Sequence, residues 1–323
     1  MYEAFFGLRE RPFDLVPNPR FLYLTPRQQE AFSNLRYGLM VSRGMTLLLG
    51  EAGTGKTTLL KSVLAEIDTS SVECVLMSNP TLTRAEFYEF LTTGFKLSPD
   101  AANSKTRFLL ELSRHLQERY ESGGVSAIVL DEAQSLSYEL LEEVRLLSNI
   151  DTEKVKLLNV VLAGQPELAA RLNEPSLRQL KQRIGLRCEL VSLDFPETAA
   201  YIAGRLKIAG GEPAAIFSRE AIQTIHAMSR GLPRTINVIC ENALIGGFAA
   251  HARPVSRSIV EDVCHDFDLG AVPSAPDEPL VNTRDAREPQ APAGAAPATP
   301  APEPDGREPL FAEAGRKRRF SFF

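Results

Sequence analysis

Runs of apolar residues alternate with amphipathic stretches along the first two thirds of the chain. Five short apolar runs predict buried strands at Met45–Leu49, Val72–Met77, Val125–Leu130, Val155–Ala163 and Leu186–Val191. Between them, apolar positions recur with helical spacing and predict helices at Thr57–Ile67, Arg84–Leu97, Lys105–Tyr120, Tyr138–Asn149 and Glu167–Arg183. Strands that alternate with helices are typical of an α/β fold. The pattern therefore predicts a five-stranded parallel sheet with crossover helices.

The pattern changes after Val191, where the strand signal stops. Helical spacing continues alone in four stretches: Pro196–Ala209, Arg219–Met228, Arg234–Ala250 and Ser256–Phe267. A small all-α domain therefore follows the α/β domain. We expect an N-terminal segment at residues 1–30 that contributes to a nucleotide pocket, the α/β domain at 31–193 and the helical domain at 194–269.

The rest of the chain has a different composition. Residues 270–314 are rich in Pro and Ala and have too little apolar surface to offset the entropy of ordering, so they predict a disordered linker. Residues 315–323 read GRKRRFSFF and place four cations before three aromatic residues. Such a tail is suited to docking on a partner protein or on anionic lipid. A solubilising tail without a partner is the alternative.

Composition narrows the class of protein. The chain has 323 residues, enough for about two domains, and its 44% hydrophobic and 24% charged residues are typical of a globular protein. No apolar run approaches the roughly 20 residues of a membrane-spanning helix, and the N-terminus lacks a signal-peptide pattern, so we expect a cytoplasmic protein. The four cysteines form no CxxC pair, which argues against a zinc site or a disulfide framework. A net charge of −5 argues against nucleic-acid binding driven by overall charge, although local basic patches stay open.

A glycine-rich loop follows the first predicted strand and leads into a helix. It matches G-x-x-x-x-G-K-[ST], the pattern of a phosphate-binding loop, at Gly50, Glu51, Ala52, Gly53, Thr54, Gly55, Lys56 and Thr57, and we expect the next residue, Thr58, to bind the nucleotide with them. The glycines let backbone N–H groups surround phosphate oxygens at the start of a helix. We expect Lys56 on the β- and γ-phosphates and the Thr57 hydroxyl on Mg²⁺.

Two carboxylates stand where the third predicted strand ends. Asp131 and Glu132 follow the glycine-rich loop by about 75 residues, and ligands of open parallel sheets bind at the carboxyl ends of strands. We expect Asp131 to hold Mg²⁺ and Glu132 to polarise the attacking water. Gln165 closes the fourth predicted strand and is expected between the two phosphate-binding strands. A simple turn before Pro166 is the alternative.

Two arginines are further candidates. Arg183 lies in a basic stretch with Arg178 and Arg187, and a guanidinium offered to a neighbouring subunit would stabilise charge on a γ-phosphate. Solvated helix charges or interdomain ion pairs are the alternative. Arg234 follows Pro233, which suits the first turn of a helix, and is expected to reach back to the phosphates.

The order of these motifs resembles that of an AAA+ ATPase. The stretches GEAGTGKTTLL, LEEVRLLSN, KLLNVVLAGQPEL and GLPRTIN, and the opening YEAFFGLRERPFDLVPNPRFLY, are similar to the clade that contains the secretion ATPases (ExeA/GspA) and the MshM-like pilus ATPases. The resemblance covers about residues 1–268. It implies a P-loop NTPase fold with a helical lid, and a cytoplasmic homo-oligomer that uses ATP and Mg²⁺.

The resemblance also implies individual roles. They are Lys56 and Thr57 as Walker A, Asp131 and Glu132 as Walker B, Gln165 as sensor one, Arg183 as the arginine finger and Arg234 as sensor two, with the segment around Pro19–Tyr23 closing over adenine. Secretion-type relatives continue into a transmembrane helix and a peptidoglycan-binding domain, whereas this sequence has a linker and a basic tail. Gln28 also stands where a histidine is common. The missing envelope module favours a short branch that works in pilus or exosortase-linked polysaccharide systems.

The leading hypothesis is an ATP-hydrolysing subunit that powers or regulates assembly of a secretion, pilus or polysaccharide export apparatus. Its tail would dock on an inner-membrane or envelope assembly protein, which would make the protein peripheral to the inner membrane. One alternative is a DNA-binding transposition regulator of the MuB/TniB type, although the sequence shows no basic stripe. Another is a scaffold that binds ATP without turnover.

Overall fold

The computed structural model describes residues 1–14, 19–41, 44–78, 81–153 and 155–269. The chain divides into two units, Met1–Val272 and Pro273–Phe323. The predicted linker and the basic tail lie outside the described residues. No helix in the described part of the chain has the length and apolar character needed to cross a membrane.

A parallel sheet of five strands forms the centre of the first unit, as the sequence predicts. The strands are β1 (Met45–Gly50), β2 (Val72–Met77), β3 (Val125–Leu130), β4 (Leu158–Gly164) and β5 (Ile184–Leu190), in the order β2-β3-β4-β1-β5. The prediction that β4 starts at Val155 is wrong, because Lys156 pairs antiparallel with Asp151 in a preceding turn. The order places β4 between β1 and β3.

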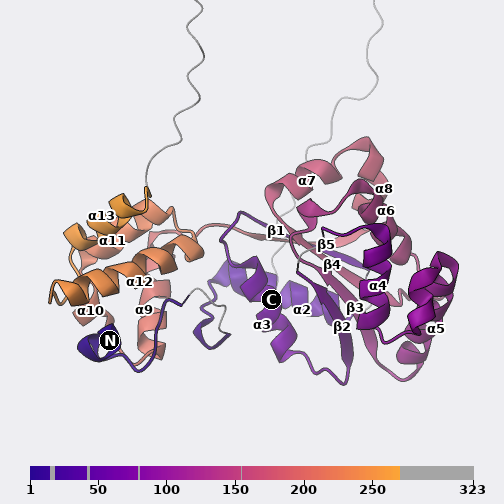
Figure 1. Ribbon diagram of the computed structural model, residues 1–323, viewed down its shortest axis with the longest axis horizontal. Helices are drawn as coiled ribbons and strands as arrows, with labels where there is room; N and C mark the ends of the chain where they lie inside the picture. The colour runs from indigo at the N-terminus through magenta and orange to yellow at the C-terminus, as the bar shows by residue number, and fades with distance from the viewer. Residues whose placement is uncertain (15–18, 42–43, 79–80, 154, 270–323) are drawn as a thin grey trace, which may run out of the picture. The chain divides into compact units, whose positions relative to one another are not determined.

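Helices cover both faces of the sheet (Figure 1). One face carries α2 (Pro26–Met40) and α3 (Lys56–Glu66), and the other carries α4 (Arg84–Gly94), α5 (Lys105–Glu121), α6 (Tyr138–Leu147) and α7 (Pro166–Leu172). Successive strand residues point to opposite faces, so Leu47 and Leu49 enter one apolar core and Leu48 enters the other. Burial on both faces explains why the central strands are almost continuously apolar.

Two helical predictions need correction. The periodicity did not predict α2, which Thr25 caps through a capping box with Gln28 and which begins at Pro26. The single helix predicted over Glu167–Arg183 is broken, because Pro175 lacks a backbone N–H and starts a 3-10 turn. A short helix, α8 (Arg178–Lys181), follows that turn.

The helical domain follows β5, as predicted. It contains α9 (Phe195–Ile208), the unpredicted α10 (Pro213–Ile216), α11 (Arg219–Ser229), α12 (Pro233–Ala249) and α13 (Arg257–Asp266). Its apolar core includes residues from the start of the chain, among them Tyr2 and Phe6 of α1 (Tyr2–Phe6), Phe13 and Phe21. The N-terminal segment is therefore packed into the helical domain. The predicted boundary between residues 30 and 31 falls inside α2.

Candidate functional site

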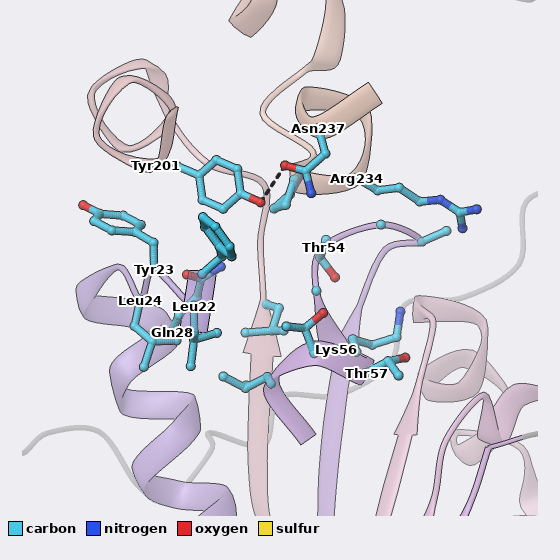
Figure 2. Close-up of a pocket in the computed structure, with 18 of the residues that line it drawn as sticks. Leu22, Tyr23, Leu24, Gln28, Thr54, Lys56, Thr57, Tyr201, Arg234 and Asn237 are labelled. Carbon is cyan, nitrogen blue, oxygen red and sulfur yellow. Dashed lines mark hydrogen bonds between the residues drawn. The ribbon is translucent and has the colours of Figure 1, made fainter. Parts of the chain in front are cut away.

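A cavity of about 550 Å³ lies at the carboxyl edge of the sheet, and its size is within the range of small-molecule sites. The cavity is lined by the N-terminal segment, the glycine-rich loop, the ends of β3, β4 and β5, and helices α9 and α12. Figure 2 shows two distinct ends. Thr54, Lys56 and Thr57 lie at one end, which we name the phosphate end, and Leu22, Tyr23, Leu24 and Tyr201 lie at the other, which we name the base end.

The glycine-rich loop joins β1 to α3 at the phosphate end. Gly53 and Gly55 have φ values of +84° and +98°, which glycine adopts without the strain that a side chain would cause. Lys56 is only 5% exposed, and its ammonium donates to the carbonyls of Gly50 at 2.8 Å and Glu51 at 3.1 Å. Burial lowers the pKa of Lys56, while the nearby carboxylates Glu132 and Asp131 oppose that change.

The ends of β1 and β3 bring two oxygen groups together. The Thr57 hydroxyl at the start of α3 donates to Oδ2 of Asp131 at 2.6 Å. Asp131 is 2% exposed, and its Oδ1 accepts from the backbone N–H of Glu132 at 3.0 Å. Hydroxyl and carboxylate oxygens are the hard donors that Mg²⁺ prefers. With the lysine and the glycine-rich backbone beside them, these residues fit a magnesium-bound triphosphate.

Glu132 and Gln165 line the same cavity, and Gln165 follows β4, between the strands that carry the loop and Asp131. Gln165 Nε2 lies 3.4 Å from Oε2 of Glu132. The same carboxylate oxygen accepts from Nε2 of Gln134 at 2.5 Å. Gln134 is a site residue that the sequence did not predict, although it is the last residue of the DEAQ stretch that contains Asp131 and Glu132.

The two arginine candidates differ in position relative to the cavity. Arg234 lines the cavity, and its backbone N–H donates to the Gly53 carbonyl at 3.1 Å. Its side chain lies on the side of Thr54 and Lys56 in Figure 2. Arg183 follows α8, does not line the cavity, and makes no ion pair with any residue that the structure describes. Its assignment to a neighbouring subunit's site stays a prediction.

The base end contains residues that no motif marks. Tyr201 of α9 donates to Oδ1 of Asn237 on α12 at 2.9 Å (Figure 2), and its ring meets that of Tyr23 edge to face, with centroids 6.3 Å apart. Arg205, one turn after Tyr201, is 8% exposed and donates to the carbonyls of Pro12 at 2.6 Å and Phe21 at 3.3 Å. The N-terminal segment thus reaches the cavity through contacts that are distant in sequence.

Comparisons with known proteins agree with this geometry. The AAA domain family matches residues 39–172. General secretion pathway protein A of Aeromonas hydrophila is 44% identical over 251 residues, which are 77% of this chain and 45% of that protein. The chain thus spans less than half the length of this relative.

Two solved structures are similar in fold. The ORC2 protein of Aeropyrum pernix has a TM-score of 0.60 at 16% identity, over 82% of this chain and 74% of that one. Cdc6p from Pyrobaculum aerophilum has a TM-score of 0.58 at 20% identity, over 76% of this chain and 70% of that one. At these identities the likeness concerns the fold alone. The AAA domain match over residues 39–172 and the sequence identity together make this chain similar to AAA+ P-loop ATPases, General secretion pathway protein A among them.

Proposed function

We propose that this chain binds Mg-ATP in the cavity and hydrolyses it to ADP and phosphate. One observation carries the proposal: the Thr57 hydroxyl lies 2.6 Å from the Asp131 carboxylate, at the end of the cavity that Lys56 and Glu132 line. The glycine-rich loop, the carboxylate at the end of β3 and the Lys56 ammonium therefore lie at the same end of the cavity. A glycine-rich surface turn would not require a buried lysine and a buried carboxylate beside it.

Each residue of the phosphate end has its own role in the proposed reaction. Lys56 exchanges the carbonyls of Gly50 and Glu51 for phosphate oxygens, while the backbone N–H groups of the loop bind the rest of the phosphate chain. Thr57 and Asp131 hold Mg²⁺, which when bound offsets negative charge on the β- and γ-phosphates. Glu132 takes a proton from the attacking water. As the water oxygen bonds to the γ-phosphorus, the bond between that phosphorus and the oxygen of the leaving ADP breaks.

The biological setting is a further part of the proposal. The 44% identity to General secretion pathway protein A supports a task in secretion. We propose that hydrolysis powers or regulates assembly of a secretion, pilus or polysaccharide export apparatus. We propose that the protein acts as a homo-oligomer, with Arg183 facing a neighbour's phosphates, and docks through residues 315–323. Deleting those residues should preserve ATP hydrolysis and reduce recovery with membranes. Unchanged recovery would exclude the docking function of the tail.

Two variants of the full chain test the enzymatic proposal. Lys56→Ala should weaken ATP binding by about 30-fold or more, because a charge-assisted contact is lost. Glu132→Gln should keep ATP binding and lower kcat by about 100-fold or more, because only the proton acceptor is lost. Binding is measured with a fluorescent ATP analogue and turnover by phosphate release. ATP binding by the parent without phosphate release above the background would instead support the scaffold that binds ATP without hydrolysis, and equal measurable turnover in the parent and Glu132→Gln would show that Glu132 is not the base.

A further inference from the structure

Gln134 occupies a fixed place beside the proposed catalytic base. Glu132 has a φ of +54°, a left-handed conformation that is uncommon for residues other than glycine. The chain therefore turns sharply after β3 and enters the 3-10 turn Ala133–Ser135. This turn returns the Gln134 side chain to Glu132, where Nε2 donates to Oε2 at 2.5 Å.

The other end of the Gln134 amide is also bonded. Its Oε1 accepts from the backbone N–H of Gln165 at 3.1 Å. A backbone N–H can only donate and a carboxylate can only accept, so the amide has one orientation that satisfies both partners. Its NH₂ group must face Glu132 and its oxygen must face Gln165.

The backbone of Gln134 is held from the opposite side. Arg171 of α7 donates through Nη1 to the Gln134 carbonyl at 2.6 Å. The Arg171 guanidinium also lies 4.7 Å from the centre of the Tyr138 ring, and the Tyr138 hydroxyl donates to Glu174 at 2.6 Å. Gly164 leaves room for the amide, since a Cβ there would lie 2.9 Å from Oε1 of Gln134. Gln134 is thus fixed by contacts from two neighbouring elements.

We propose that Gln134 is a positioning residue for ATP hydrolysis, which holds one oxygen of the Glu132 carboxylate so that the other is presented to the attacking water. This inference rests on the proposed function. Without Gln134, Oε2 of Glu132 would keep only the 3.4 Å contact to Gln165, and the side chain would rotate among several rotamers. Catalytic groups displaced by about 1 Å lose on the order of 100-fold in rate.

Gln134→Glu is the sharpest variant, because it keeps the shape of the side chain and an oxygen for the Gln165 N–H. It replaces the donor to Glu132 by a second carboxylate oxygen, which repels Glu132 instead of holding it. We expect kcat to fall by about 10- to 100-fold, with KM and the affinity for the ATP analogue within about twofold of the parent. Gln134→Ala should show the same split, and Gln223→Ala, on the exposed face of α11, should match the parent.

A double-mutant cycle separates positioning from a structural defect. On a Glu132→Ala background, Gln134→Ala should cause no further loss of kcat, because there is no carboxylate left to position. A further loss in the double variant, or weaker nucleotide binding in Gln134→Glu, would overturn the proposal in favour of a structural role. Parent-like kcat in Gln134→Glu would overturn it while leaving ATP hydrolysis in place. A parent protein that does not hydrolyse Mg-ATP would overturn both.

Discussion

The two ends of the cavity are built in different ways. The phosphate end consists of one continuous loop and two strand ends, and its contacts are made by backbone groups, one ammonium and two oxygen groups. Thr57 and Asp131 meet there because β1 and β3 end at the same edge of the sheet. The ordered backbone fixes these groups before any ligand arrives. Interactions of this kind act on developing charge, so we expect the phosphate end to govern turnover.

The base end is assembled from the N-terminal segment, α9 and α12. Its contacts join residues far apart in sequence, such as Arg205 with Pro12 and Phe21, and Tyr201 with Asn237. The base end is lined by Leu22, Leu24 and the rings of Tyr23 and Tyr201. Contacts of this kind are the same in the bound substrate and in the transition state. They therefore strengthen nucleotide binding without raising kcat. We expect the base end to contribute to nucleotide affinity and to the stability of the helical domain, with little effect on kcat.

The largest effect should follow from removal of the metal carboxylate at the phosphate end. Asp131→Ala takes away the acceptor of the Thr57 hydroxyl and one oxygen proposed for Mg²⁺. Metal-assisted charge stabilisation is worth several kcal/mol, so kcat with saturating Mg-ATP should fall by about 1,000-fold. Phosphate release measures kcat. Asp262 is exposed on α13, and Asp262→Ala serves as the control. A kcat within tenfold of the parent would show that turnover does not depend on the contact between Thr57 and Asp131.

The same contrast explains what the sequence could predict. Lys56, Thr57 and Asp131 are identified by short patterns, because a phosphate loop requires glycines and a lysine at fixed spacing and a buried strand delivers its acid at a fixed edge. The parallel sheet followed from the apolar runs for a similar reason, since strands buried on both faces leave a strong local signal. These features depend on neighbours in sequence.

Residues at the base end depend on tertiary structure instead. Tyr201 and Arg205 lie on an ordinary amphipathic helix, and nothing local distinguishes them from core and surface residues. Their partners lie more than 30 residues away in one case and about 190 in the other. Pro175 itself is a local signal that a helix breaks there, but the helical spacing of apolar residues on both sides of it predicted one continuous helix. Gln134 also had a local signal, its place in the DEAQ stretch. Only the fold shows that its side chain contacts Glu132.

The second effect concerns Arg205 at the base end. Its guanidinium lies 5.1 Å from the centre of the Phe21 ring and 5.3 Å from that of Tyr201, in addition to its bonds to backbone carbonyls. Arg205→Met would leave the Pro12 and Phe21 carbonyls without this donor, so we expect a loss of about 2 kcal/mol in unfolding free energy. Denaturant unfolding measures that loss.

The loosened N-terminal segment in Arg205→Met should also weaken ATP-analogue binding by about tenfold, while kcat at saturating ATP stays within about twofold of the parent. Arg205→Lys keeps the charge but not the planar fork, and it should recover only part of the affinity. A large fall in kcat with unchanged affinity would erase the distinction between the two ends.

The smallest effect should come from Tyr201→Phe, which removes one hydroxyl and keeps the ring. That hydroxyl donates to Asn237 at 2.9 Å and accepts from Arg205 at 3.0 Å, so its loss should cost about 1 kcal/mol of unfolding free energy. Burial raises the pKa of the Tyr201 phenol above its usual value, so the hydroxyl stays protonated, and the loss should be equal at pH 6 and pH 9. Tyr120→Phe, at a half-exposed ring on α5, is the matched control. A loss that grows from pH 6 to pH 9 would mean that the hydroxyl ionises in the folded protein before it does so in the unfolded chain, and the base end would then be an electrostatic site like the phosphate end.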